Sequence, residues 1–262
     1  MPILRLAGKA PRRRRPVNSA LGARMHHCRL CLQPAPLCAS HVIPEFLYSD
    51  LYNDKGHMMG IHGRGKKGWK PLQKGLTEKL LCDTCEQYLS KHFETPFHRS
   101  WVAKSLLPSP WPLLEPHVVR VDYTNIKLFH LSVLWRASVS TLGTFNDVRL
   151  GPHEDRIRQM LLARDPGPAW LYPVMGLVLI KPDARTIVQM ITMPLADRFE
   201  GHRCYTMAYG GVHWWTAVAS HKSHDWMSAS LTESGDWPLV SVPWTQLGEV
   251  HAASLALKRA GA

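Results

Sequence analysis

Between residues 83 and 97, apolar side chains recur every four positions, which predicts a helix with one buried stripe. The stripe comprises Cys85, Leu89, Phe93 and Phe97. The neighbouring face of the same helix carries Glu86, Ser90 and Glu94. Because residues four apart lie above one another on a helix, a metal ion bound by Glu86 would find Glu94 two turns further along.

Two more helices are predicted further along the chain. Apolar residues cover two faces of the segment from about residue 123 to residue 141, which indicates a helix at the centre of the fold. These residues are Ile126, Leu128, Phe129, Leu131, Val133, Trp135 and Val139. The other helix begins near Pro152 and ends before Asp165. Acidic side chains at residues 154 and 155 suit its first turn, where they stabilise the helix dipole.

Strand patterns occupy most of the remaining chain. Residues 36–42 predict a short strand with His41 near its end, and residues 45–52 predict a helical turn or two. Beyond residue 170 we expect antiparallel strands at residues 174–180, 186–193, 204–209 and 212–219, with Gly210-Gly211 as a hairpin turn. Residues 220–235 predict a polar loop, and residues 238–244 predict an edge strand.

Charge and proline content divide the chain into four parts. Residues 1–24 predict a flexible basic arm, and residues 25–97 predict a first folded unit. Residues 98–121 contain four prolines and predict a linker packed on the body. Residues 122–262 predict an α+β domain with the long helix and an antiparallel sheet. The expected fold class of the whole chain is α+β.

The composition excludes several classes of protein. The 262 residues are 45% apolar and 20% charged, which is enough for a core and excludes wholesale disorder. No apolar run approaches the ~18 residues that span a bilayer, and residues 1–16 lack the apolar region of a secretory signal. We therefore expect a cytoplasmic protein with no membrane partner. Its six cysteines are then reduced, which favours metal binding over disulfides.

The whole chain has a net charge of +12, and its basic residues gather in the N-terminal part. No acidic residue precedes Glu45, whereas eight lysines and arginines do. This distribution predicts contact with nucleic acid, and double-stranded DNA is the expected partner. The residues expected to contact it are Arg12, Arg13, Arg14, Arg15, Arg64, Lys66, Lys67 and Lys70. A solvated basic surface or free tail is the alternative interpretation.

Two Cys-x-x-Cys motifs, Cys28 to Cys31 and Cys82 to Cys85, supply four thiolates. Four thiolates complete the tetrahedral shell of a structural Zn²⁺ ion, which these residues are predicted to bind. The 50 residues between the motifs exceed the usual spacing of a zinc knuckle. The alternatives are redox-active pairs or a chance pattern, but neither motif lies in the βαβ context of thioredoxin-like proteins.

The order of these motifs resembles that of the HNH, or ββα-metal, nucleases, in the version whose four cysteines clamp the fold with zinc. The resemblance covers residues 25–97 and depends on His41 at a strand end and Glu86 directly after the fourth cysteine. It implies that His41 activates water. It also implies that Ser40 and Glu86 occupy the positions that hold a catalytic Mg²⁺ or Mn²⁺ ion. The helix spacing described above adds Glu94 as a further candidate ligand. The family usually has Asp or His where this chain has Ser40.

The sequence therefore predicts a zinc-clamped, HNH-like endonuclease module that hydrolyses phosphodiester bonds in DNA, with His41 and Glu86 as its catalytic residues. The α+β domain would select the target, a partner protein or a second copy of the chain, as in an antiviral defence nuclease. Two alternatives stay open. One is a catalytically inactive zinc module that binds nucleic acid, in which His41 is structural. The other is an interaction protein in which the zinc unit is a scaffold.

Overall fold

The computed structural model describes residues 26–55, 58–60, 70–72, 75–104, 106–112, 116–219, 222 and 224–247. The predicted arm at residues 1–24 lies outside these ranges. Within the described ranges, no helix is both long enough and apolar enough to cross a bilayer. Helices and strands are mixed, so the predicted α+β class is confirmed.

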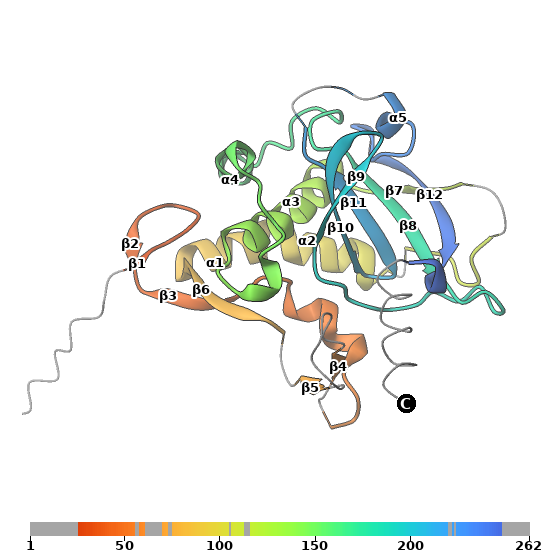
Figure 1. The fold of residues 1–262 in the computed structure, drawn as a ribbon, viewed down its shortest axis with the longest axis horizontal. Coiled ribbons are helices and arrows are strands. Elements are labelled where there is room, and N and C mark those ends of the chain that lie inside the picture. The colour runs from red at the N-terminus through yellow and green to blue at the C-terminus, as the bar shows by residue number, and fades with distance from the viewer. Residues whose placement is uncertain are drawn as a thin grey trace, which may run out of the picture.

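The N-terminal part is built around a two-stranded antiparallel hairpin followed by a helix (Figure 1). Strand β3 (Leu37–His41) pairs with β6 (Thr77–Cys82), and α1 (Asp83–Leu89) follows β6 directly. A smaller ladder, β1 (His26–His27) with β2 (Pro34–Ala35), encloses the first Cys pair. The connection from β3 to β6 contains a 3-10 helix (Glu45–Leu51) and strands β4 (Met58–Gly60) and β5 (Lys70–Leu72).

The helix that begins at Asp83 continues beyond its predicted end. After α1 come π-type turns at Ser90–Glu94, helix α2 (Thr95–Phe97) and further π-type turns at His98–Val102. The predicted stripe is confirmed, because all four of its members are buried. Wider π-type turns rotate the following residues relative to a regular α-helix, and such insertions are frequent at functional sites.

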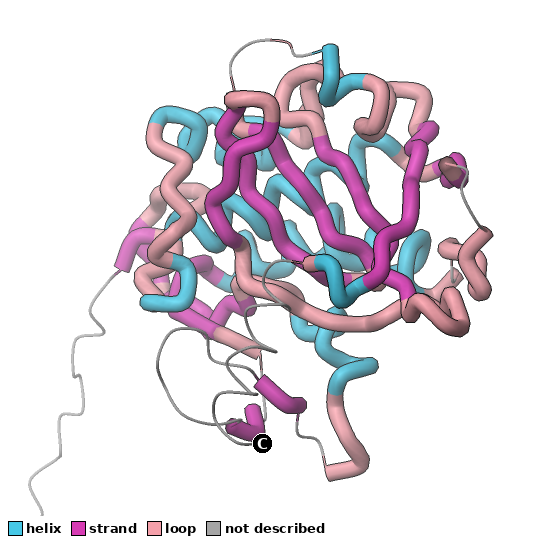
Figure 2. Tube along the Cα trace, turned by 45° about the vertical axis from the view of Figure 1, so that its right-hand side comes forward, coloured by secondary structure: helices cyan, strands magenta, loops and turns pink. Residues whose placement is uncertain are grey.

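The C-terminal part combines two helices with a six-stranded sheet. Helix α3 (Tyr123–Val139) crosses one face of the sheet, and α4 (Pro152–Ala163) packs on α3 (Figures 1 and 2). The strand order is β7-β12-β8-β11-β10-β9. The strands are β7 (His117–Arg120), β8 (Val174–Ile180), β9 (Leu195–Phe199), β10 (His202–Tyr209), β11 (Val212–Ala217) and β12 (Asp236–Pro243). Short helix α5 (His224–Met227) and a 3-10 turn (Trp244–Gln246) lie on either side of β12 in the chain.

The sheet differs from the predicted one in three respects. Strand β12 is internal rather than an edge strand and runs parallel to β8, so the sheet is mixed. Strands β7 and β9 were missed. In β9, Asp197 and Arg198 interrupt the apolar pattern, as charges often do on edge strands. The strand expected at residues 186–193 is wrong: that segment forms an isolated bridge, from Ile187 to Ile180, and no continuous strand. Its alternating apolar side chains instead pack on two separate hydrophobic clusters.

One large hydrophobic core joins the parts that the sequence separated. It includes residues from the β3–β6 hairpin, the helix that follows it, α3, α4 and the sheet. Phe97 stacks on Phe129 of α3 with a centroid separation of 3.9 Å. Trp101, in the segment expected to be a linker, donates from Nε1 to the carbonyl of Gly210 at 3.0 Å. The N-terminal hairpin is therefore held against the C-terminal part by continuous packing.

Glu78 of β6 also ties the hairpin to the end of α3. Its carboxylate accepts hydrogen bonds from Ser140 Oγ at 2.6 Å and from Thr141 N at 3.0 Å. Burial acts to raise the pKa of Glu78, but these hydrogen bonds and the nearby Arg29 charge outweigh it, so the pKa lies below its ordinary value.

A lowered carboxyl pKa stabilises the fold above the unfolded-state pKa, and this stability is lost as the pH falls through the folded-state pKa. We expect Glu78→Gln to be less stable than the wild type at pH 7. Its stability should also decline less between about pH 5 and pH 3. Urea unfolding of both proteins across this range measures the difference. Parallel curves would contradict the assigned role of the carboxylate.

Candidate functional site

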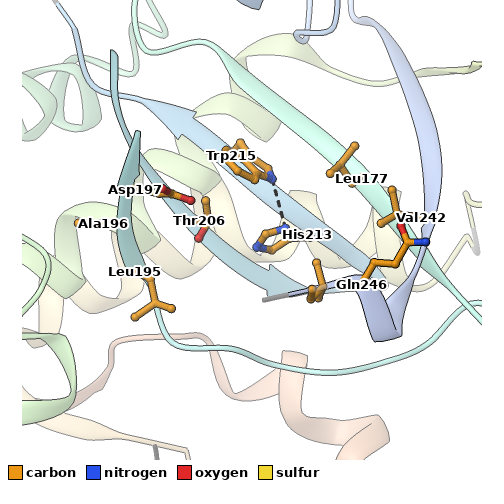
Figure 3. A pocket seen from close by; sticks show the side chains of 10 residues that line it. Leu177, Leu195, Ala196, Asp197, Thr206, His213, Trp215, Val242 and Gln246 are labelled. Atoms are coloured by element: carbon orange, nitrogen blue, oxygen red, sulfur yellow. Dashed lines mark hydrogen bonds between the residues drawn. The ribbon is translucent and has the colours of Figure 1, made fainter. Parts of the chain in front are cut away.

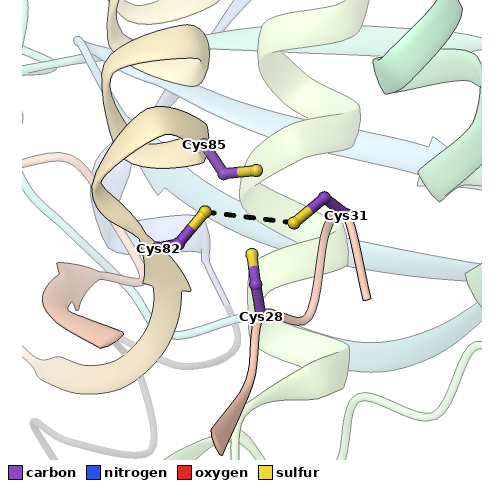
Figure 4. A group of neighbouring side chains, drawn as sticks. All are labelled: Cys28, Cys31, Cys82 and Cys85. Atoms are coloured by element: carbon purple, nitrogen blue, oxygen red, sulfur yellow. Dashed lines mark hydrogen bonds between the residues drawn. The ribbon is translucent and has the colours of Figure 1, made fainter. Parts of the chain in front are cut away.

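The four cysteines of the two predicted motifs lie together. The Sγ atoms of Cys28, Cys31, Cys82 and Cys85 are all within 4.8 Å of one another, and Figure 4 shows them pointing toward a common centre. The Cys31 and Cys82 sulfurs are 3.9 Å apart. A tetrahedral zinc site with Zn–S bonds near 2.3 Å requires sulfurs about 3.8 Å apart. The cluster is therefore placed to bind a metal ion and is consistent with structural zinc.

Local backbone geometry brings each pair of thiols into position. Cys28 and Cys31 lie in a tight turn. Leu32 closes this turn: its φ is positive, at 63°, and its N–H donates to the Cys28 carbonyl at 2.9 Å. Cys82 ends β6, and Cys85 lies in the first turn of α1. The turn is fastened to β6 by the Arg29 N–H, which donates to the Leu80 carbonyl at 2.9 Å. The strand-to-helix junction and the turn therefore form the two halves of the cluster.

Electrostatics at the cluster favour a bound cation. Burial and neighbouring thiols raise the pKa of Cys85 and contribute to the raised pKa of Cys82. For Cys28 burial acts in the same direction, but backbone hydrogen bonds at Cys82, Cys31 and Leu30 outweigh it and lower the pKa. A thiolate that accepts backbone hydrogen bonds is stabilised in the form that binds a metal ion. A bound dication would hold the other thiols in their ionised form.

Next to this cluster, Ser40 of β3 meets Glu86 of α1. The Ser40 side chain is fully buried, and its Oγ donates to Glu86 Oε2 at 2.6 Å. The contact follows from the chain order, because Glu86 comes directly after Cys85 and Ser40 lies on the strand paired with β6. Two residues that the sequence predicted to share a site, 46 positions apart, are in direct contact.

His41, the last residue of β3, faces the carboxylate of Glu45, which was not among the predicted site residues. Its Nε2 atom lies 2.8 Å from Glu45 Oε2, although the pair lacks hydrogen-bond geometry. Tyr52 donates to the other oxygen of Glu45 at 2.6 Å. Burial and the Glu45 carboxylate raise the pKa of Tyr52 to about 12, so this hydroxyl remains a donor. Glu45 follows His41 by four positions, and this spacing was the only sequence feature that could have linked the two residues. Pro44 lies between them and made the link hard to recognise.

Glu94 pairs with a basic residue of helix α3. Its Oε1 atom lies 2.8 Å from Nη1 of Arg136, a residue of α3 whose side chain is only 1% exposed. The same nitrogen donates to the backbone carbonyl of His41 at 2.9 Å. Arg136 was not predicted to belong to the site, because the residue lies within a helix predicted to be buried on two faces.

Within the described part of the chain, the cysteines form the only group of three or more His, Cys, Asp or Glu side chains close enough to share an ion. His41, Glu86 and Glu94 do not form such a group. The predicted nucleic-acid contacts at Arg12 to Arg15, Arg64, Lys66 and Lys67 lie outside the described residues, and Lys70 is described only as the start of β5.

A separate hollow of about 580 Å³ lies on the C-terminal sheet. Figure 3 shows Asp197, Thr206 and His213 among its mostly apolar lining, with Trp215 Nε1 donating to His213 Nδ1 at 3.2 Å. Its size is in the range of small-molecule sites. None of the residues predicted to act in catalysis lines it.

No protein-family model, curated protein or solved structure matches this chain.

Proposed function

We propose that this chain is a metal-dependent endonuclease of the HNH type that hydrolyses phosphodiester bonds in DNA. The observation that carries the proposal is the 2.6 Å contact between Ser40 Oγ and Glu86 Oε2. It joins the residue before His41 to the residue after the fourth cysteine. In the family that the sequence resembles, those two positions hold the divalent ion beside the histidine.

His41 is the proposed general base. Glu45 Oε2 lies 2.8 Å from its Nε2 atom, and a carboxylate beside the basic imidazole is a recurring arrangement in hydrolases. Nδ1 has no hydrogen-bond partner among the described residues and is the nitrogen proposed to take a proton from the attacking water. The side chain is 29% exposed, which leaves the ring accessible from solvent.

Glu86 is the proposed ligand for the catalytic ion, and Ser40 orients its carboxylate. When bound, Mg²⁺ or Mn²⁺ would neutralise charge on the scissile phosphate and on the leaving oxygen. Magnesium commonly keeps several waters and binds through one or two carboxylates together with substrate phosphates. A site with a single carboxylate is therefore compatible with this ion before the substrate arrives.

Arg12 to Arg15 are proposed to contribute non-specific contacts with phosphates. Replacing all four with Gln should weaken binding to every DNA sequence alike. It should also reduce the magnitude of the slope of log K against log salt concentration by up to about 3.6, which is about 0.9 for each lost phosphate contact. The reason is that each neutralised phosphate releases counterions. Fluorescence anisotropy at several salt concentrations measures both effects. Unchanged affinity and slope would identify these arginines as a tail without contacts.

Strand cleavage tests the proposed activity. Purified protein should nick supercoiled plasmid in the presence of Mg²⁺ or Mn²⁺, and EDTA at a concentration that leaves zinc bound should stop the reaction. Zinc content is measured in both samples, so loss of the structural ion cannot be mistaken for loss of the catalytic one. DNA binding without nicking would support the second candidate function below.

The second candidate is a zinc module that binds nucleic acid without cutting it. It is favoured by one observation: apart from the four cysteines, the described residues supply no group of three potential metal ligands. Ser40 itself is a neutral hydroxyl where the family usually has a ligand. In this alternative, His41 and Glu45 stabilise the strand end, and the zinc cluster supports a binding surface.

A further inference from the structure

Arg136 of helix α3 is buried where the hairpin meets the C-terminal part, and it uses one nitrogen twice. Its Nη1 atom donates to the carbonyl of His41 at 2.9 Å and pairs with Glu94 Oε1 at 2.8 Å. Its Nε atom makes a longer bond, 3.4 Å, to the Ser132 carbonyl in the preceding turn of the helix. The guanidinium therefore bridges the end of β3 and the first π-type turns.

This arrangement is costly for stability alone. Arg136 is 1% exposed and Glu94 is 18% exposed, so both charges are largely removed from water. Desolvation of a buried ion pair often cancels its electrostatic attraction, and an apolar pair of similar volume is frequently as stable. Arg136 Nη2 is also buried and has no hydrogen-bond partner among the described residues, which adds a further penalty. A buried arginine with an unused donor suggests a requirement other than stability.

The contacts of Arg136 indicate that it is required to hold His41 in position. The side chain of His41 faces Glu45, while its backbone carbonyl accepts from Arg136. The next residue, Val42, donates its N–H to the Leu76 carbonyl at 3.1 Å, which ends the pairing of the hairpin. Arg136 thus anchors the backbone at His41, where the connection from β3 to β6 begins and the regular strand pairing stops.

We propose that Arg136 is a positioning residue: from the C-terminal part, it fixes the strand end that carries the proposed general base. This inference depends on the proposed nuclease function. It makes α3 an integral part of the nuclease centre, because the guanidinium holds both His41 and the π-type turns that carry Glu94. A displacement of about 1 Å in a catalytic group can reduce a rate about 10²-fold.

The test compares Arg136→Met with Lys127→Met. Lys127 is a matched control, since it is also a 1% exposed basic side chain of α3 and also donates to a backbone carbonyl, that of Pro168 at 2.7 Å. It lies about 13 Å along the helix from Arg136. Both variants should retain zinc and lose thermal stability. Only Arg136→Met should lower kcat, by about 10²-fold, with KM for DNA unchanged because the residue is buried.

Arg136→Lys provides the rescue. A single nitrogen makes both contacts, so an ammonium group near its place should restore kcat to within about tenfold of wild type. If Arg136→Met does not fold, Arg136→Gln takes its place in the same comparison. Equal losses of kcat in the Arg136 and Lys127 variants would overturn the proposal, because both residues would then act only through stability.

A second readout separates this proposal from the proposed function. The imidazole NMR signals of His41, assigned with a His41→Ala sample, should shift in Arg136→Met and stay in place in Lys127→Met. This measurement needs no cleavage. If wild-type protein cuts no nucleic acid but the His41 signals move as expected, the nuclease function fails and the positioning contact stands. Unmoved His41 signals in Arg136→Met would overturn the positioning role whether or not the protein cuts DNA.

Discussion

Cys82→Ser is expected to remove zinc from the protein and to unfold the region around the cysteine cluster. Purified wild-type protein should carry about one zinc ion per chain. Structural zinc contributes on the order of 10 kcal/mol of binding free energy, and this energy is coupled to folding. The β1–β2 ladder and the start of α1 meet at the cluster, so they should lose protection first in hydrogen exchange. The shared core should preserve the sheet of the C-terminal part.

Cys38→Ser is the matched control, because Cys38 is a half-buried thiol of β3 outside the cluster. It should keep both zinc and thermal stability. Metal analysis and thermal melting, with and without a chelator, measure the two variants. A native protein that contains no zinc and whose four cluster thiols react freely would contradict the metal assignment.

His41→Ala is expected to abolish cleavage while zinc content, melting temperature and DNA affinity stay near those of the wild type. The imidazole is assigned to proton transfer and is not part of the cysteine shell. Removing a general base typically costs 10²-fold or more in rate. Single-turnover cleavage measures the loss. His92→Ala is the control, since His92 lies outside the contacts of His41 and Glu86 and should keep its activity.

Two neighbouring substitutions distinguish the base from the metal ligand. Glu86→Ala should also lose cleavage, but higher Mg²⁺ or Mn²⁺ should restore part of it, whereas His41→Ala should stay inactive. Ser40→Asp would bring a second carboxylate next to Glu86 at a fully buried position. Repulsion should then lower the melting temperature without divalent ions, and Mg²⁺ should raise it more than in the wild type. A Ser40→Asp protein insensitive to Mg²⁺ would argue against a metal site here.

Local patterns predicted the elements that depend on local chemistry. The stripe from Cys85 to Phe97 identified the helix after β6, and the hairpin at Gly210-Gly211 follows from two glycines that both adopt positive φ. The four-cysteine cluster was predictable for a chemical reason: two Cys-x-x-Cys motifs complete one tetrahedral shell regardless of how many residues separate them.

Features that depend on distant pairing were not predictable from the chain alone. Strand β12 enters the sheet between β7 and β8, and nothing local in residues 236–243 indicates a parallel neighbour about 60 positions earlier. The apolar faces of the helix after β6 and of α3 predicted burial without naming the partner, so the shared core appeared as two separate units. Arg136 was hidden for the same reason, since its partners are His41 and Glu94 in the other part of the chain.

The nuclease activity is tested most directly by the rate of cleavage by wild-type protein as Mg²⁺ or Mn²⁺ is titrated, on a mixture of DNA and RNA substrates, with zinc content held constant. Cleavage of DNA should rise to saturation with the divalent ion and should disappear in His41→Ala at every concentration. If the wild-type chain cleaves neither DNA nor RNA at any concentration of either ion, the nuclease assignment is contradicted, and a zinc module that only binds nucleic acid takes its place.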